Sequence, residues 1–153
     1  MTTSKSVTNY GMNEMYVDAS AIVAILNNEP EKALLLHKLE TAQTSPYVSA
    51  VTFLEAVLSY ARTAREDDND PVTEEMMVAA RNDVTNLLKS INAKNAAIME
   101  KTGETAYHYS LKYGRGRHPA KLNMGDCLAA ACASEYRLPL LYKGNDFSQT
   151  DLT

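Results

Sequence analysis

The chain has 153 residues, of which 45% are hydrophobic and 22% charged, as is ordinary for a soluble globular domain. Its formal net charge of -4 argues against a protein that coats nucleic acid by bulk electrostatics, although it allows a local basic patch. No run approaches the ~18 apolar residues of a membrane span and no signal peptide is visible, so we expect a cytoplasmic protein without a membrane partner. Cys127 and Cys132 lie in one helical pattern, at a spacing that predicts reduced thiols.

A flexible tail is expected over residues 1–14, followed by a single domain over residues 15–153. Tyr16 and Val17 suit a buried strand, and Asp18 follows them directly, before an apolar helical pattern. In open α/β sheets ligands bind beyond the carboxyl ends of the strands, where Asp18 would lie. Asp is also among the best residues for capping a helix N-terminus, and on this stretch alone capping is the stronger interpretation.

Strand and helix patterns alternate along the rest of the chain. The expected strands cover residues 15–17, 45–49, 96–99 and 139–142. The expected helices cover residues 19–28, 51–65, 73–90, 103–113 and 127–136, and a further helix opens at 29–31. This alternation predicts an α/β protein, a three-layer α/β/α sandwich with a short parallel sheet.

Four acidic residues follow strands or begin helices of this pattern: Asp18, Glu55, Asp126 and Asp146. Each has a structural explanation, because Glu55 lies on a polar helix stripe, Asp126 resembles the end of a capping box with Asn123, and Asp146 lies in a turn. In an alternating sheet, however, all four would converge at one rim. Clustered carboxylates raise one another's pKa values unless cations neutralise them, and Mg²⁺ prefers such oxygen ligands.

A basic segment precedes the last of the helices. Between residues 112 and 121 the chain has four cations and no acid, and glycines and a proline mark a loop. One interpretation is a solubilising surface turn. The other is an arm that contacts nucleic-acid phosphates, and the residues alone favour neither.

Four segments together resemble the PIN-domain ribonucleases and, more narrowly, the VapC-type toxins of bacterial toxin–antitoxin pairs. They are Val17-Asp18-Ala19-Ser20, Ser49 to Glu55, Leu122 to Cys127, and Leu141 to Phe147. The Asn-x-Gly-Asp and Lys-Gly-x-Asp-Phe pieces are specific in combination. The basic stretch from Gly116 to Ala120 also resembles a subgroup of that family. The resemblance covers residues 15–153.

This resemblance implies a PIN-like fold and a Mg²⁺- or Mn²⁺-dependent endoribonuclease that hydrolyses single-stranded or loop RNA. It also implies a homodimer that a small cognate antitoxin neutralises. Asp18, Glu55 and Asp126 would hold the principal metal directly or through water, and Asp146 would hold a second metal or orient the attacking water. The groups expected to fix these carboxylates are Ser20, Asn123 and Asn145. The residues expected to bind RNA are Lys112, Arg115, Arg117, His118 and Lys121.

Two other classes of function stay open. A metal-dependent phosphatase could use the same strand-end acids with an aspartate nucleophile, but it would favour a second Asp two residues after Asp18, where the chain has Ser20. A non-catalytic interaction domain would use the four acids only as caps and turns.

Overall fold

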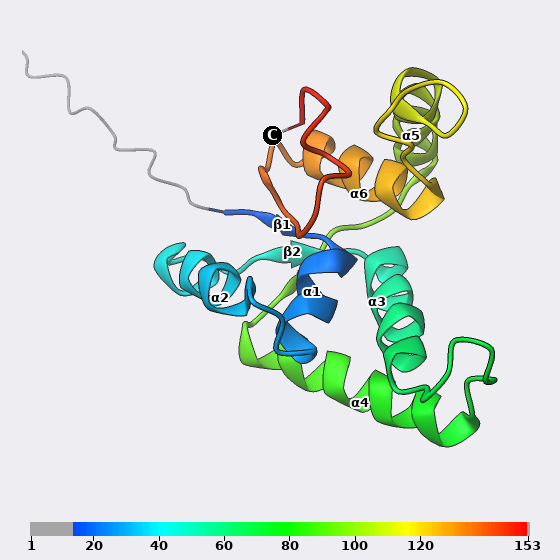
Figure 1. Cartoon of the computed structure of the whole chain (residues 1–153). Helices are drawn as coiled ribbons and strands as arrows, with labels where there is room; N and C mark the ends of the chain where they lie inside the picture. The colour runs from blue at the N-terminus through cyan, green and yellow to red at the C-terminus, as the bar shows by residue number, and fades with distance from the viewer. Residues whose placement is uncertain (1–13, 153) are drawn as a thin grey trace, which may run out of the picture.

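The computed structural model describes residues 14–152, so the expected tail, apart from Glu14, lies outside the described residues. Four short parallel strands form one sheet in the order β3-β2-β1-β4 (Figure 1). The strands are β1 (Tyr16–Val17), β2 (Tyr47–Val48), β3 (Lys94–Asn95) and β4 (Leu140–Leu141). The helices are α1 (Ala19–Leu26), α2 (Lys32–Thr41), α3 (Ala50–Thr63), α4 (Glu74–Ser90), α5 (Glu100–Tyr113) and α6 (Met124–Glu135).

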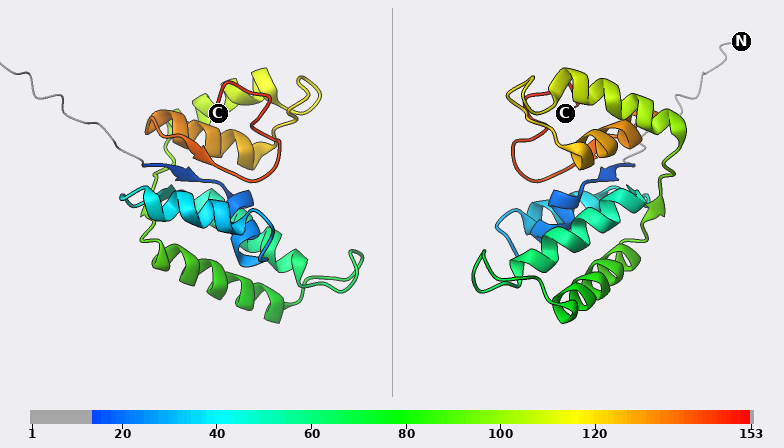
Figure 2. Two further views of the ribbon diagram at one scale, coloured as in Figure 1. Left: turned by 60° about the vertical axis from the view of Figure 1, so that its left-hand side comes forward. Right: turned by 90° about the vertical axis from the view of Figure 1, so that its right-hand side faces the viewer.

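Helices cover both faces of this sheet, which confirms the predicted α/β/α sandwich. Helices α1 to α4 lie on one side and α5 and α6 on the other, as Figures 1 and 2 show. The chain steps from β1 to β2 to β3 in one direction and then crosses to β4 beyond β1. Right-handed crossovers in opposite directions place their helices on opposite faces. The direction changes between β1 and β4, where open α/β sheets bind ligands beyond the carboxyl ends of the strands.

The two layers have separate hydrophobic cores. On one side of the sheet Val17, Ile22 and Val84 are fully buried among α1, α3 and α4. On the other side α6 lies close to the sheet. Its segment Ala129–Ala133 is fully or almost fully buried and consists of four alanines and Cys132, and such small side chains allow the helix to approach the strands. Cys127 and Cys132 are buried free thiols, as predicted. Although α6 is apolar on nearly every side, neither it nor any other helix within residues 14–152 is long and apolar enough to cross a membrane.

The third strand differs from the prediction. It was expected over residues 96–99, whereas β3 is Lys94–Asn95, which pairs with β2 at the edge of the sheet. Both of its residues are exposed, so no apolar pattern marks them. The apolar Ala96 follows the strand and is buried, and its N–H donates to the Val48 carbonyl at 2.8 Å. Helices α5 and α6 each begin three residues earlier than expected, at Glu100 and Met124.

Candidate active site

The four predicted acids line one cavity at the carboxyl edge of the sheet. Asp18 follows β1, Asp146 lies in the loop after β4, and Glu55 and Asp126 lie near the N-terminal ends of α3 and α6. The cavity has a volume of about 260 Å³, and its lining comprises Asp18, Ala19, Ser20, Val23, Glu29, Glu55, Ser59, Asn123, Asp126, Lys143 and Asp146. The structure therefore brings together all four acids that the sequence singled out, although their catalytic role stays a prediction.

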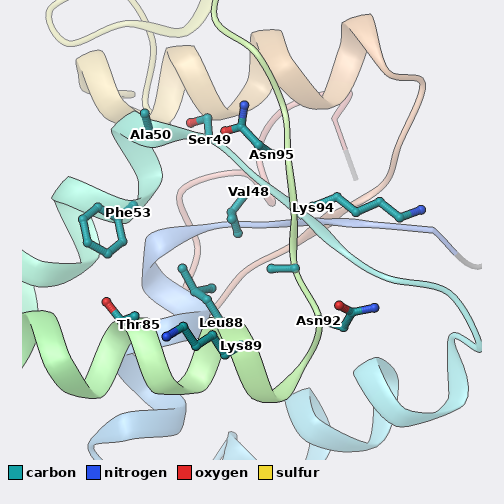
Figure 3. Close-up of a pocket in the computed structure, with 11 residues that line it drawn as sticks. Val48, Ser49, Ala50, Phe53, Thr85, Leu88, Lys89, Asn92, Lys94 and Asn95 are labelled. Atoms are coloured by element: carbon teal, nitrogen blue, oxygen red, sulfur yellow. The ribbon is translucent and has the colours of Figure 1, made fainter.

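A larger cavity lies elsewhere and has a different character. It measures about 500 Å³ and lies between α3, α4 and the edge strand β3 (Figure 3). Its lining combines apolar side chains such as Phe53 and Leu88 with Lys89 and Lys94, and it includes no acid. Size alone would thus select a cavity without the clustered groups that chemistry at a phosphate requires.

Asp18 caps α1, which is one of the two roles that the sequence left open, and it also lines the cavity. Its Oδ2 caps α1 by accepting hydrogen bonds from the Ser20 N–H at 3.0 Å and the Ser20 hydroxyl at 2.6 Å. Its Oδ1 is buried and has no hydrogen-bond partner among the described residues. Burial raises the pKa of this carboxyl, and Asp146 adds to the rise, while the bonds from Ser20 oppose it. One oxygen therefore holds the helix, and the other is available to a cation.

Asp126 also combines a cap with a place in the cavity. Its Oδ2 accepts from the Asn123 N–H at 2.9 Å, and the Asn123 Oδ1 accepts from the Asp126 N–H at 2.8 Å, which is the predicted capping box. The pKa of Asp126 is raised to about 6, mainly by burial and then by the charges of Asp18 and Asp146, while the hydrogen bond from the Asn123 N–H and the charge of Arg115 oppose the rise. The Asn123 backbone N–H thus holds this carboxylate, while the Asn123 side chain caps the helix.

Asn145 does not have the position expected for it. Its side chain is exposed and has no hydrogen bond to any of the four carboxylates in the part of the chain that the structure describes. Instead its backbone carbonyl accepts from the Ser148 hydroxyl at 2.8 Å and closes the turn after β4. The expected role in fixing a carboxylate therefore has no support in the hydrogen bonds.

Glu55, like Asp18, has a buried carboxylate oxygen with no partner in the described chain, and in Glu55 this oxygen is Oε2. The pKa of Glu55 is raised to about 7, mainly by burial and then by the charges of Asp18 and Asp126, while Arg62 opposes the rise. The carboxylate lies against the backbone of Gly125, where an added Cβ would approach Oε1 to 2.6 Å. The sequence analysis assigned no role to Gly125, although a glycine in the first turn of a helix is a signal for such a close approach.

Two of the residues expected to bind RNA have local partners. The Lys112 ammonium lies 3.0 Å from Asp151 Oδ2 and 4.9 Å from the centre of the Tyr113 ring. The His118 Nδ1 accepts from the Ala120 N–H at 3.1 Å, and its ring meets the Tyr113 ring edge-on. Both side chains therefore lie against the Tyr113 ring, Lys112 from the last turn of α5 and His118 from the loop that follows it.

The other three expected RNA contacts, Arg115, Arg117 and Lys121, are exposed on this loop. Arg115 lies close enough to the cavity to lower the pKa of Asp126. The loop therefore brings positive charge to the acidic rim.

The acids suit a hard divalent cation. All the donors are carboxylate oxygens, and two of them, Asp18 Oδ1 and Glu55 Oε2, are buried without a partner in the described chain. Within residues 14–152 no three acidic, histidine or cysteine side chains lie close enough to bind one ion in this conformation. Mg²⁺ commonly uses one or two carboxylates and keeps several waters, so this set fits water-mediated coordination.

The raised pKa values predict an unusual pH dependence for the metal-free protein. Folding raises the pKa of Glu55 from 4.5 to about 7 and that of Asp126 from 3.8 to about 6. At pH values between the unfolded and folded pKa of each group, the folded chain binds more protons than the unfolded chain. The free energy of unfolding therefore falls as the pH rises from about 4 to about 7. Urea unfolding in EDTA should show higher stability at about pH 5 than at about pH 8. A flat or opposite dependence would contradict the raised values, and Glu55→Gln with Asp126→Asn should flatten it.

Comparison with known proteins agrees with this geometry. The model of the PIN domain family matches residues 15–152. The chain therefore belongs to the PIN-domain family.

Within that family its relatives are VapC ribonucleases. A VapC ribonuclease of Rhizobium meliloti is 40% identical over 144 residues, which is 90% of this chain and 98% of the relative. Ribonuclease VapC36 of Mycobacterium tuberculosis is 37% identical over 138 residues, which is 90% of this chain and 91% of the relative. The chain is thus a PIN-domain protein of the VapC type.

Proposed function

We propose that this chain is a toxin that hydrolyses phosphodiester bonds in single-stranded or loop RNA with the help of Mg²⁺ or Mn²⁺. The observation that carries the proposal is the convergence of four carboxylates in one cavity, where Asp18 and Glu55 each have a buried oxygen without a hydrogen-bond partner among residues 14–152. The relatives are named ribonucleases, which supports RNA as the substrate.

The position of each acid in the cavity suggests its role. Asp18, Glu55 and Asp126 would hold the principal cation directly or through water, and the exposed Asp146 would hold a second ion or orient the attacking water. When bound, the metal supplies a hydroxide near neutral pH and neutralises charge on the phosphoryl oxygens. Ser20 keeps Asp18 Oδ1 turned away from the helix by occupying Oδ2. A phosphatase with an aspartate nucleophile is less well supported, because the residue two after Asp18 is this serine.

The decisive experiment measures RNA cleavage and metal binding separately. We expect cleavage of a labelled single-stranded RNA with Mg²⁺ or Mn²⁺ and none in EDTA. Mn²⁺ at about a hundred times its Kd should also stabilise the RNA-free protein by about 2.7 kcal/mol, which thermal unfolding detects. Cleavage that persists in EDTA would overturn the metal dependence. An interaction domain without a metal site would show neither cleavage nor a change in melting temperature.

We assign RNA binding to the exposed cations Arg115, Arg117 and Lys121. RNA must approach a cavity rich in carboxylates, and the loop places positive charge beside it. Lys112 and His118 belong to the same proposal, but their contacts with Asp151, Tyr113 and Ala120 give them a structural role as well.

Arg117→Ala should weaken RNA binding and make its salt dependence shallower. Each lost phosphate contact on a single strand reduces the slope of log K against log salt by about 0.7. Such a contact is made equally in the ground and transition states, so KM should rise while kcat is nearly unchanged. A salt titration of RNA affinity measures the slope, with Arg81→Ala on the exposed face of α4 as the matched control. Equal slopes for wild type and Arg117→Ala would show that the loop is a surface turn.

The proposal extends to partners and compartment. A homodimer is supported by large exposed apolar side chains on α6 and on the two helices that each contact it, namely Met124 of α6, Leu54 of α3, and Tyr107 and Leu111 of α5. A toxin of this kind also needs a small cognate antitoxin that neutralises it in the cytoplasm. The support for that partner is the VapC type of the chain.

A further inference from the structure

One basic residue lines the acidic cavity, and the proposed mechanism does not use it. Of the residues within 14–152 that line the cavity, Lys143 alone is basic. Its ammonium lies 3.0 Å from the Glu29 Oε2, in the turn between α1 and α2. Both side chains are partly exposed, 37% for Lys143 and 27% for Glu29. The pair therefore lies at the mouth of the cavity rather than in the core.

The backbone of Lys143 is tied to the acidic site. Its N–H donates to the Ser20 hydroxyl at 3.0 Å, and that hydroxyl donates to Asp18 Oδ2 at 2.6 Å. Two hydrogen bonds thus fix the start of the Lys143 side chain relative to Asp18. Its ammonium end is held, among the described residues, by the ion pair with Glu29 Oε2, which is itself buried, while 37% of the Lys143 side chain is exposed.

We propose that Lys143 is a substrate-binding residue whose ammonium rests on Glu29 in the free protein and moves to a phosphate of the RNA strand that enters the cavity. This inference rests on the proposed ribonuclease function. Lysine suits the role because it is a compact charge with three donors on a flexible stem, and a phosphate can replace a carboxylate as its partner. Because Lys143 is fixed to Asp18 through Ser20, the phosphate it binds would be positioned relative to the metal-holding acids.

Glu29 has a distinct part in this arrangement. Glu29 and RNA compete for the same ammonium, so the acid weakens RNA binding in the free protein. If the pair were only a structural tie between the α1–α2 turn and the loop after β4, removing either partner would have the same kind of effect. If Glu29 restrains Lys143, removing Glu29 alone raises the RNA affinity, whereas removing Lys143 alone lowers it.

The test compares Lys143→Met and Glu29→Gln in the full chain. The probe is a labelled single-stranded RNA of mixed sequence, with affinity measured in EDTA and cleavage measured with Mg²⁺. We expect Lys143→Met to weaken binding about fivefold, with kcat within about twofold of wild type and a salt slope shallower by about 0.7. Glu29→Gln should tighten binding about threefold, and Lys143→Arg should keep more affinity than Lys143→Met, because it retains the positive charge. Lys38→Met, an exposed lysine of α2 outside the cavity, is the control.

The double variant separates release of Lys143 from a general loss of negative charge. The gain from Glu29→Gln should disappear in the Lys143→Met background, because no ammonium remains to be released. A gain that persists there, or equal weakening by both single variants, would overturn the inference. If the wild type cleaves RNA, the proposed ribonuclease function is supported even when one of these two results refutes the role of Lys143. Opposite shifts in affinity without any cleavage would support the RNA contact and refute the nuclease.

Discussion

Asp126→Asn should reduce RNA cleavage by about a thousandfold while leaving the fold intact. The substitution removes a charge that would hold the metal, and metal stabilisation of transition-state charge is worth several kcal/mol, of which about 4 kcal/mol corresponds to a thousandfold. The asparagine Oδ1 can still accept from the Asn123 N–H, so the capping box survives. Loss of the charge also relieves repulsion from Asp18 and Asp146. The melting temperature of the metal-free protein should be unchanged or up to about 3 °C higher.

Cleavage kinetics and thermal unfolding of the same preparations check this prediction. Asp83→Asn is a suitable control, because Asp83 is exposed on α4, outside the acidic cavity, and its carboxylate accepts a hydrogen bond from the Tyr60 hydroxyl at 3.2 Å. It should cleave like wild type. Marked destabilisation of Asp126→Asn with retained cleavage would mean that this acid is only a helix cap.

The sequence predicted the layers of the fold better than the edge of its sheet. Buried strands and amphipathic helices have apolar patterns in the sequence, and these patterns predict β1, β2 and β4. Strand β3 leaves none, because Lys94 and Asn95 are exposed and their pairing with β2 is carried by backbone hydrogen bonds such as Lys94 N–H to the Pro46 carbonyl at 2.8 Å. A hydrogen bond between backbones has no signature in side-chain type.

Thr52 shows a second limit, which concerns predicting the environment of a side chain from helical spacing. It lies three residues before Glu55, so helical spacing puts both on the polar stripe that the sequence shows, and both would be expected in the same environment. In the structure Thr52 is buried and its hydroxyl lies 2.7 Å from that of Tyr16, whereas Glu55 faces the cavity. The polar stripe therefore crosses from the core to the acidic rim.

The four acids of the site could be predicted because the topology of a parallel sheet brings the residues after its strands to one edge. Contacts across that edge could not be predicted. Glu55 meets Gly125, and Lys143 meets Glu29, only because helices and loops far apart in the chain pack together. Spacing along the sequence says nothing about which carboxylate a particular glycine or lysine will face.

Gly125→Ala should reduce RNA cleavage by about a hundredfold with little change in stability. A Cβ at this position would overlap the Glu55 carboxylate, which is the far end of a flexible side chain and can move away. Moving a catalytic group by about 1 Å can reduce the rate about a hundredfold, because the reacting atoms lose their alignment. Stability should hardly fall, since alanine favours the helix over glycine by up to about 1 kcal/mol and offsets part of the repacking.

Gly103→Ala is the matched control for this change. Gly103 also lies near the N-terminal end of a helix, α5, but an added Cβ there meets nothing within 4 Å. Its substitution should therefore raise the melting temperature slightly and leave cleavage unchanged, because only the helix preference acts. Steady-state cleavage and thermal unfolding of both variants separate the two effects. If Gly125→Ala cleaves RNA as fast as Gly103→Ala, the Glu55 carboxylate is not needed where the structure places it, and its assignment to the metal site is wrong.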